Sequence, residues 1–231
     1  MDDHERKELI DLYEKRLEKY GKDVRTVGWS SLIQQITRFE ALSQIDNLQN
    51  KTLLDVGCGF GDLYSFLSQK KIQLKEYKGI DLSSKMIKIA KEIHSNKDNV
   101  GFEVLNLLDD NLDEIINKRY NYVFASGIFS FPIKDNLNYF KLMLRKMFDI
   151  CSLGVAVNMP TTYVDYKDEN LFYYEPESVF TFSKTLTRRV SLLHDYMPFE
   201  FTLFLFKNVE FEENNVFIEY RKKKKINSYI E

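Results

Sequence analysis

The spacing of apolar positions changes near residue 50. Before that point apolar residues recur every three or four positions among charges, and this spacing predicts amphipathic helices over 3–20 and 30–45. We expect Gly21 to end the first helix, which we interpret as a cover rather than a core element. The second helix is expected to bury one apolar side, made of Leu32, Ile33, Ile36, Phe39, Leu42 and Ile45.

From residue 51 short apolar runs alternate with helical patterns, which is typical of a parallel sheet with crossover helices. Strands are expected at 51–56, 76–81, 100–105, 120–125 and 153–158. Helical patterns lie between them at 62–70, 83–95, 111–118 and 135–150. Ser83 is the expected N-cap of the helix at 83–95. Two β-rich runs follow at 187–194 and 199–206, with Pro198 in the turn between them.

Glycines are concentrated just after the first strand, in the stretch LLDVGCGFGD. The strand ends near Asp55, and Gly57, Gly59 and Gly61 precede the next helix. Glycine admits positive φ angles and lets a ligand approach the bare backbone, so this loop is a candidate nucleotide cradle. A dinucleotide would place its pyrophosphate at the helix N-terminus, where Asp62 would repel it. We therefore favour S-adenosylmethionine, which carries no phosphate, over a dinucleotide.

A second acidic residue supports the same ligand. Asp81 closes the next strand, 20 residues after Gly61, where a carboxylate can accept both hydroxyls of an adenosine ribose. With these residues in place, LLDVGCGFG followed by GIDLS resembles the Rossmann-like (class I) S-adenosylmethionine-dependent methyltransferases, over about residues 50 to 206. The resemblance implies an α/β fold: a seven-stranded, mostly parallel sheet with helices on both faces, an antiparallel last strand and an N-terminal helical cap.

The resemblance also implies where the cofactor binds. Asp55 and the glycine loop would hold its methionine part and Asp81 its ribose, while the ends of the third and fourth strands would face the adenine and the methyl group. Asn106 stands where the family commonly has Asp, and its carbonyl can still accept from the adenine amino group. The cofactor contacts predicted in this way are Asp55, Gly57, Cys58, Gly59, Gly61, Asp81, Leu82, Met86, Asn106, Leu107, Ser126 and Gly127.

The segment YGKDVRTVGWSSLIQQITRF resembles the N-terminal cap of a bacterial subgroup of these enzymes. Its matching residues, Trp29, Gln35 and Arg38, join the predicted cofactor contacts. Gln35 and Arg38 lie three positions apart, on one helix face. The Arg38 guanidinium could pair with the carboxylate of the methionine moiety or tether the cap through a salt bridge, and both alternatives are open. Trp29 could pack the cap or face the sulfonium.

Candidate catalytic residues come from the carboxyl edge of the sheet, where ligands of such folds bind. The resemblance places the turn at 194–200 and the loop after the fifth strand there, so we nominate His194, Tyr163 and Glu200. Each also has a structural interpretation, His194 as a hydrogen-bonding residue at a strand end. A general base is optional, since an amine acceptor can lose its proton to water.

We expect three parts in one domain: a helical cap over 1–48, an S-adenosylmethionine-binding methyltransferase domain over 49–206 and a peripheral tail over 207–231. A formal charge of −2 points to neither nucleic acid nor membrane as a partner. The two cysteines lie outside any zinc-type spacing, which predicts no metal and reduced thiols. The charged N-terminus MDDHERKELI lacks the apolar core of a signal peptide, so a cytoplasmic location is expected.

The predicted function is transfer of a methyl group from S-adenosylmethionine to an O or N atom of a small-molecule acceptor. One alternative is an RNA or protein methyltransferase, but the sequence after the fourth strand, ASGIFSFP, carries no N-P-P-Y or D-P-P-Y motif. Another alternative is an S-adenosylmethionine-binding protein that has lost its chemistry. A dinucleotide-dependent oxidoreductase is the least favoured alternative, because Asp62 would repel a pyrophosphate. The basic run 221–225 is interpreted as a solvated end.

Overall fold

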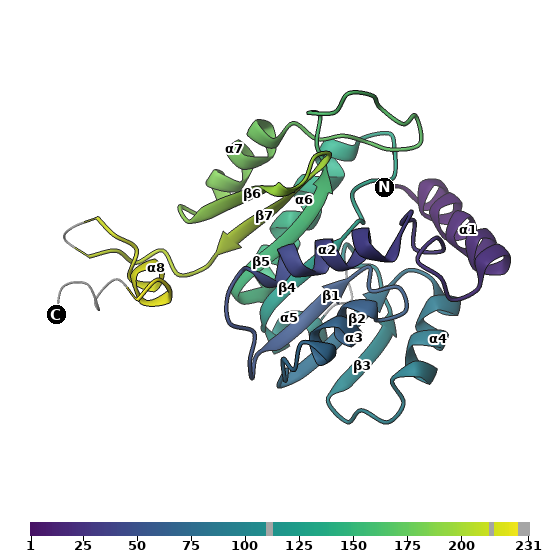
Figure 1. The fold of residues 1–231 in the computed structure, drawn as a ribbon, viewed down its shortest axis with the longest axis horizontal. Helices are drawn as coiled ribbons and strands as arrows, with labels where there is room; N and C mark the ends of the chain where they lie inside the picture. The colour runs from purple at the N-terminus through teal and green to yellow at the C-terminus, as the bar shows by residue number, and fades with distance from the viewer. Residues whose placement is uncertain (110–112, 213–214, 226–231) are drawn as a thin grey trace.

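The fold is a seven-stranded sheet with helices on both faces (Figure 1). The computed structural model describes residues 1–109, 113–212 and 215–225. The strand order is β3-β2-β1-β4-β5-β7-β6. The strands are β1 Thr52–Val56, β2 Glu76–Asp81, β3 Val100–Val104, β4 Tyr120–Ser126, β5 Cys151–Pro160, β6 Val190–Met197 and β7 Glu200–Phe206.

Strands β1 to β5 are parallel, whereas β7 runs antiparallel between β5 and β6. All seven predicted strands are confirmed within a few residues, as is the antiparallel last strand. The pairing of Pro160 with Glu200 sets the β6–β7 turn beside the carboxyl end of β5. The turn at Pro198 therefore lies at the edge where the sequence placed it.

Two apolar clusters, one on each face, hold helices against the sheet. One cluster joins α2 Leu32–Ser43, α3 Asp62–Gln69 and α4 Ser84–Ile93, and the other joins α5 Asp113–Lys118, α6 Asn136–Ile150 and α7 Pro176–Leu186. Ser83 caps α4 as predicted, because its Oγ accepts from the Met86 amide at 3.3 Å. Residues 111–112 of the helix predicted at 111–118 lie outside the described residues. The range of α7 was not predicted from the sequence.

The first helix, α1 Asp3–Tyr20, begins with a capping box between Asp2 and Glu5 and ends at Gly21, whose N–H donates to the Leu17 carbonyl. All of its residues are described, and none is buried. Exposed ion pairs tie it to the domain: Lys85 Nζ lies 2.8 Å from Glu14 Oε2. Such pairs contribute little stability. The helix is therefore a cover, as predicted.

The predicted buried side of α2 is confirmed for Phe39, Leu42 and Ile45 but wrong for the N-terminal part of the helix. Leu32 and Ile33 are 58% and 73% exposed, and Ile36 is also exposed. The helix buries Gln35 and Arg38 together with Phe39, Ala41 and Leu42. Polar side chains can be buried when they are paired, and here each finds a distant acidic partner. The buried face of the helix therefore contains two paired polar side chains that hydrophobicity alone did not predict.

The described part of the tail packs on the end of α2. Helix α8 Ile218–Lys223 places Lys223 Nζ 3.0 and 2.7 Å from the carbonyl oxygens of Gln44 and Ile45. Residues 213–214 and 226–231 of the predicted tail lie outside the described residues. None of the described helices has the length and apolar character needed to cross a membrane. The division of the chain at residues 48 and 206 stays a prediction.

Candidate active site

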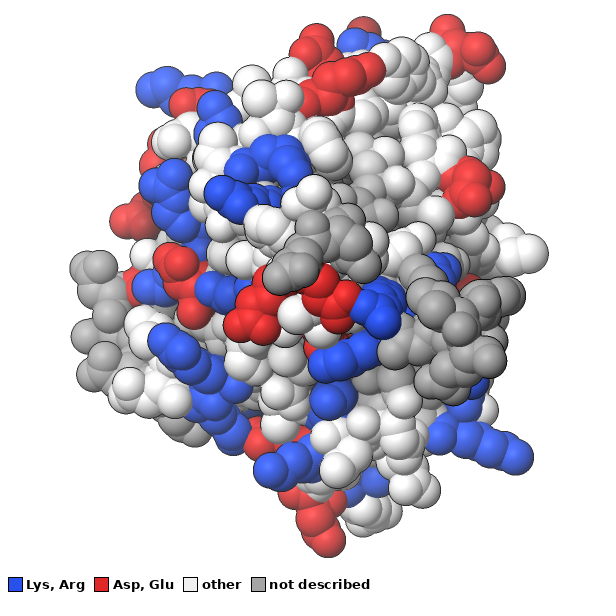
Figure 2. Space-filling view, turned by 90° about the vertical axis from the view of Figure 1, so that its left-hand side faces the viewer, with Lys and Arg blue, Asp and Glu red and all other residues white. Residues whose placement is uncertain are grey.

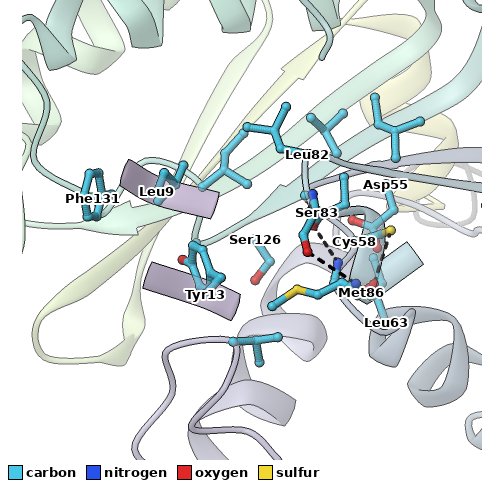
Figure 3. A pocket seen from close by; sticks show the side chains of 18 of the residues that line it. Leu9, Tyr13, Asp55, Cys58, Leu63, Leu82, Ser83, Met86, Ser126 and Phe131 are labelled. Atoms are coloured by element: carbon cyan, nitrogen blue, oxygen red, sulfur yellow. Dashed lines mark hydrogen bonds between the residues drawn. The ribbon is translucent and has the colours of Figure 1, made fainter. Parts of the chain in front are cut away.

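A pocket of about 1090 Å³, including its open mouth, lies at the carboxyl ends of strands β1, β2 and β4 (Figure 3). The glycine loop, the ends of these strands and the cap helices line it. Thirteen of the predicted cofactor contacts are among the lining residues: Trp29, Gln35, Asp55, Gly57, Cys58, Gly59, Asp81, Leu82, Met86, Asn106, Leu107, Ser126 and Gly127. Their roles toward the cofactor stay predictions, but the fold brings them together.

The glycines of the loop have different structural roles. Gly57 has a φ of +75°, and a Cβ there would lie 2.2 Å from Ile128 Cγ2, so any side chain would be strained and would displace the pocket wall. Gly61, with a φ of +78°, does not line the pocket: a Cβ there would meet the Phe102 ring at 2.7 Å. This position packs α3 against β3, and the contact of Gly61 with the cofactor stays a prediction.

Asp81 is held in place by the glycine loop itself. Its carboxylate accepts from the backbone amides of Gly59, at 3.0 Å, and Ser83, at 2.9 Å. The acid thereby fixes both the loop after β1 and the start of α4. Burial raises the pKa of Asp81, and these two hydrogen bonds oppose that rise. A carboxylate fixed at the pocket wall suits the predicted contact with ribose hydroxyls.

Asp55 is also buried at the pocket wall. It accepts a 2.5 Å hydrogen bond from the Tyr77 hydroxyl, and burial raises the pKa of Asp55 to about 7. A third carboxylate, Asp62 at the start of α3, accepts from Gln35 Nε2 at 3.2 Å.

All three carboxylates line the pocket, and no Lys or Arg does among the residues that the structure describes. The pocket therefore favours a ligand with positive charge and hydroxyls over a pyrophosphate. S-adenosylmethionine, with a sulfonium, an ammonium and a ribose, fits these donors and acceptors. Asp55, Asp81 and the glycine loop would hold it.

Asn106 lines the pocket with its side chain already engaged. Its Oδ1 accepts from the Leu108 amide at 3.2 Å, and its Nδ2 donates to Asp109 Oδ1 at 2.7 Å. These bonds fix which atom is the carbonyl oxygen. That oxygen retains one lone pair, so the predicted bond from the adenine amino group stays possible.

Arg38 makes the salt bridge of the tethering alternative. Its Nε lies 2.7 and 2.6 Å from the two carboxylate oxygens of Glu200, and both side chains are buried. Its Cζ lies 3.9 Å from the centre of the Trp29 ring, which in turn packs against Gly127. Arg38 itself does not line the pocket, whereas Trp29 does. The Arg38 Nη1 is buried and has no hydrogen-bond partner among the described residues, so the predicted contact with the cofactor carboxylate stays a prediction.

The three nominated catalytic residues lie outside the pocket lining. Glu200 is committed to Arg38. Tyr163 is 59% exposed and donates to Glu177, and its ring centre lies 6.3 Å from that of His194. His194 also packs 6.1 Å from Phe201. The turn and the loop do reach the predicted edge of the sheet, but these side chains point into packing contacts there rather than into the pocket.

Sequence reasoning missed the contribution of α1 and of the segment after β4. Leu9, Ile10 and Tyr13 reach into the pocket from α1. Leu9 and Tyr13 are four positions apart, on one face of the helix, and that spacing was the available signal. Val27, Phe131, Tyr139 and Met143 also line the pocket and were not predicted.

Comparison with known proteins agrees with this geometry. Residues 54–152, which include the glycine loop, Asp81 and the β4 end, match a family described as a methyltransferase domain. The match identifies this segment as a methyltransferase domain, and the activity that it supports is S-adenosylmethionine-dependent methyl transfer. The acceptor of the methyl group is the part of that activity that the match leaves open.

Individual relatives support the same assignment. A protein of Mycobacterium tuberculosis named as a methyltransferase is 29% identical over 160 residues, which cover 66% of this chain and 91% of that protein. The structure of the DhpI–SAH complex has a TM-score of 0.62 at 15% identity and covers 88% of this chain and 97% of that one. The small RNA methyltransferase HEN1 has a TM-score of 0.60 at 16% identity and covers 78% of this chain and 25% of that one. These two structures show a shared fold.

We predict that cofactor affinity rises with pH between about 5 and 7 and that Asp55→Asn flattens this rise. Asp55, with a pKa raised to about 7, is largely protonated at pH 5 and ionises as the pH rises. Since a cationic ligand favours the carboxylate, binding should release a proton in this window. Calorimetric titration of S-adenosylmethionine in two buffers of different ionisation enthalpy measures the release. A pH-independent affinity in the wild type would contradict the prediction.

Proposed function

We propose that this methyltransferase acts on an O or N atom of a small-molecule acceptor. The observation that carries the proposal is a pocket that holds three carboxylates and no cationic side chain among the described residues, covered by a helix. S-adenosylmethionine supplies an electrophilic methyl group on sulfur, and its transfer to an acceptor lone pair leaves the broken C–S electron pair on that sulfur. The acceptor proton leaves to water or to a base.

The chain itself contributes alignment and exclusion of water. Asp81 and the glycine loop would fix the adenosyl part, while the wall formed by Ser126, Gly127 and Trp29 limits the approach of the acceptor. Methyl transfer requires an in-line arrangement and disperses charge, so such an apolar, enclosed wall favours it. No histidine lines the pocket among the residues described. We therefore propose catalysis by positioning, without a histidine base.

The surface offers little support for a polyanionic acceptor. On the face turned to the viewer in Figure 2, Lys and Arg are interspersed with Asp and Glu. The basic run in the tail is largely engaged: Arg221 pairs with Glu212, Lys222 with Glu219, and Lys223 with backbone carbonyls of α2 and the turn after it. RNA binding favours a continuous basic surface. The fold shared with HEN1 therefore does not imply that this chain methylates RNA.

The experiment that tests the proposal is a thermal-shift series. Saturating S-adenosylmethionine and S-adenosylhomocysteine should each raise the melting temperature, while NAD should not. A ligand at 100 times its dissociation constant stabilises by about 2.7 kcal/mol. The active protein is then offered small hydroxyl and amine acceptors and a short RNA, with S-adenosylhomocysteine release as the readout. Turnover with the RNA alone would overturn the small-molecule assignment, and a shift with NAD alone would overturn the cofactor site.

A further inference from the structure

The pocket lining extends beyond the predicted cofactor contacts. It includes five side chains from α1 and from the part of the chain after β4, which we call the acceptor chamber: Leu9, Tyr13, Phe131, Tyr139 and Met143. Figure 3 shows Leu9, Tyr13 and Phe131 on one side of Ser126. Asp55 lies on the other side of Ser126 in the same view, with the glycine loop. In this view these three chamber residues thus lie away from the loop that would hold the methionine part.

The acceptor chamber differs chemically from the cofactor end. The three carboxylates of the pocket belong to the glycine-loop strand, to α3 and to β2, whereas none of the five chamber residues carries a charge at neutral pH. Two are aliphatic or thioether side chains and three are aromatic. A charged group placed here would lose its hydration without gaining an ionic partner, which is costly. The chamber therefore selects a neutral, mainly apolar body.

Two polar groups interrupt this apolar lining. The hydroxyls of Tyr13 and Tyr139 make no hydrogen bond to any residue that the structure describes, although both rings line the pocket. Tyr139 is only 8% exposed, and its ring packs 6.1 Å from Phe129. Burial raises the pKa of Tyr139 to about 12 and that of Tyr13 as well, so both phenols stay protonated. Each hydroxyl can both donate and accept a hydrogen bond.

An apolar chamber with two uncharged phenol groups in its lining matches the usual pattern of a small-molecule site, in which a few polar groups orient an otherwise apolar ligand. Both rings line the same pocket, so each phenol is available to a hydroxyl or amine of a ligand bound there.

We propose that the five chamber residues form the acceptor site and that it takes a small, neutral, ring-bearing molecule whose single hydroxyl or amine is held by Tyr13 and Tyr139. This inference rests on the proposed function, since it identifies the acceptor of that methyl transfer. Tyr13 and Tyr139 are positioning residues: they orient the nucleophile, and the proton of the O–H or N–H leaves to water. Helix α1 is then part of the acceptor site and sets its size.

The test uses the full-length protein saturated with S-adenosylhomocysteine and two matched pairs of probes. The neutral probes are 4-ethylphenol and 4-ethylaniline, and their charged counterparts are 4-hydroxybenzoate and 4-aminobenzoate. Dissociation constants are measured by protein-observed NMR. We expect each neutral probe to bind at least tenfold more tightly than its carboxylate counterpart, because none of the five chamber residues is a cation and Arg16, whose Cζ lies 5.5 Å from the centre of the Tyr13 ring, does not line the pocket.

Three variants test whether the neutral probes bind in the acceptor chamber. Leu9→Trp fills the acceptor chamber and should weaken the neutral probes at least tenfold, and Tyr13→Phe and Tyr139→Phe should each weaken them about threefold or more. Matched controls outside the pocket are Tyr166→Phe and Leu171→Trp, both at exposed positions, which should leave binding unchanged. The affinity for S-adenosylhomocysteine should change less than twofold in every variant, which also verifies that each one is folded.

The outcomes separate the two proposals. If S-adenosylhomocysteine does not bind the wild-type protein, the proposed function itself is wrong. If it binds but the neutral probes do not, or bind no better than the carboxylates, the chamber inference is overturned. It is equally overturned if the variants weaken S-adenosylhomocysteine as much as the probes, because the five residues would then belong to the cofactor site.

Discussion

Replacing Asp81 by alanine is expected to weaken S-adenosylmethionine binding by about 1–3 kcal/mol, a five- to 150-fold rise in the dissociation constant. Two losses combine. The ligand loses a charged acceptor for its ribose hydroxyls, and the amides of Gly59 and Ser83 lose the carboxylate that fixes the glycine loop and the start of α4. Calorimetric titration of the purified variant measures the effect.

A matched control lies on the neighbouring strand. Glu103 of β3 pairs with Lys78 at 2.6 Å outside the pocket, so Glu103→Ala should leave the dissociation constant unchanged. Thermal unfolding without ligand separates the two losses, because loosening of the loop lowers the melting temperature and loss of the ligand contact does not. An unchanged affinity in Asp81→Ala would remove this residue from the cofactor site.

The largest effect on stability is expected at the ion pair between Arg38 and Glu200. Breaking a buried pair leaves an uncompensated charge, so Arg38→Met should cost about 3–5 kcal/mol of unfolding free energy. Both side chains are about 95% buried, with exposed fractions of 5% and 4%. Methionine keeps much of the packing against Trp29, so the loss reports on the charge rather than on a cavity. Urea denaturation monitored by circular dichroism measures it.

A double variant distinguishes the loss of the ion pair from other causes of a lower unfolding free energy. The double variant Arg38→Met with Glu200→Leu removes both charges and should lie within about 1 kcal/mol of the wild type, or above it. At the surface, Lys78→Met breaks a pair whose acidic partner is 42% exposed and should cost less than about 1 kcal/mol. The assignment of a stabilising pair fails if Arg38→Met costs no more than this surface control, or if the double variant is as unstable as the single one.

Local sequence patterns predicted the strands and the glycine loop of this protein well. The strands were visible because a buried strand is a short apolar run, and its burial depends on residues adjacent in the chain. The glycine loop was visible for the same reason: positive φ at Gly57, Gly59 and Gly61 is a property of each position, and only glycine adopts it without strain. The role of Asp81 in binding the ribose was predicted from its position at the end of the next strand.

Orientation of the cap could not be predicted in this way. Hydrophobicity indicated that Leu32 and Ile33 of α2 would be buried, but the helix turns Gln35 and Arg38 inward. Their partners, Asp62 and Glu200, are 27 and 162 residues away in the chain. A polar residue is buried only where such a partner exists, and the sequence does not say which residues the fold brings together.

The sequence by itself thus determined the positions of the strands, the cofactor cradle and the family resemblance, because each depends on neighbours a few residues apart. The tertiary structure alone decided that Arg38 binds Glu200, that His194 and Tyr163 stay outside the pocket, and that α1 brings Leu9 and Tyr13 into it. These contacts join segments that are distant in the chain, so their geometry exists only after the sheet has formed and the cap has packed onto it.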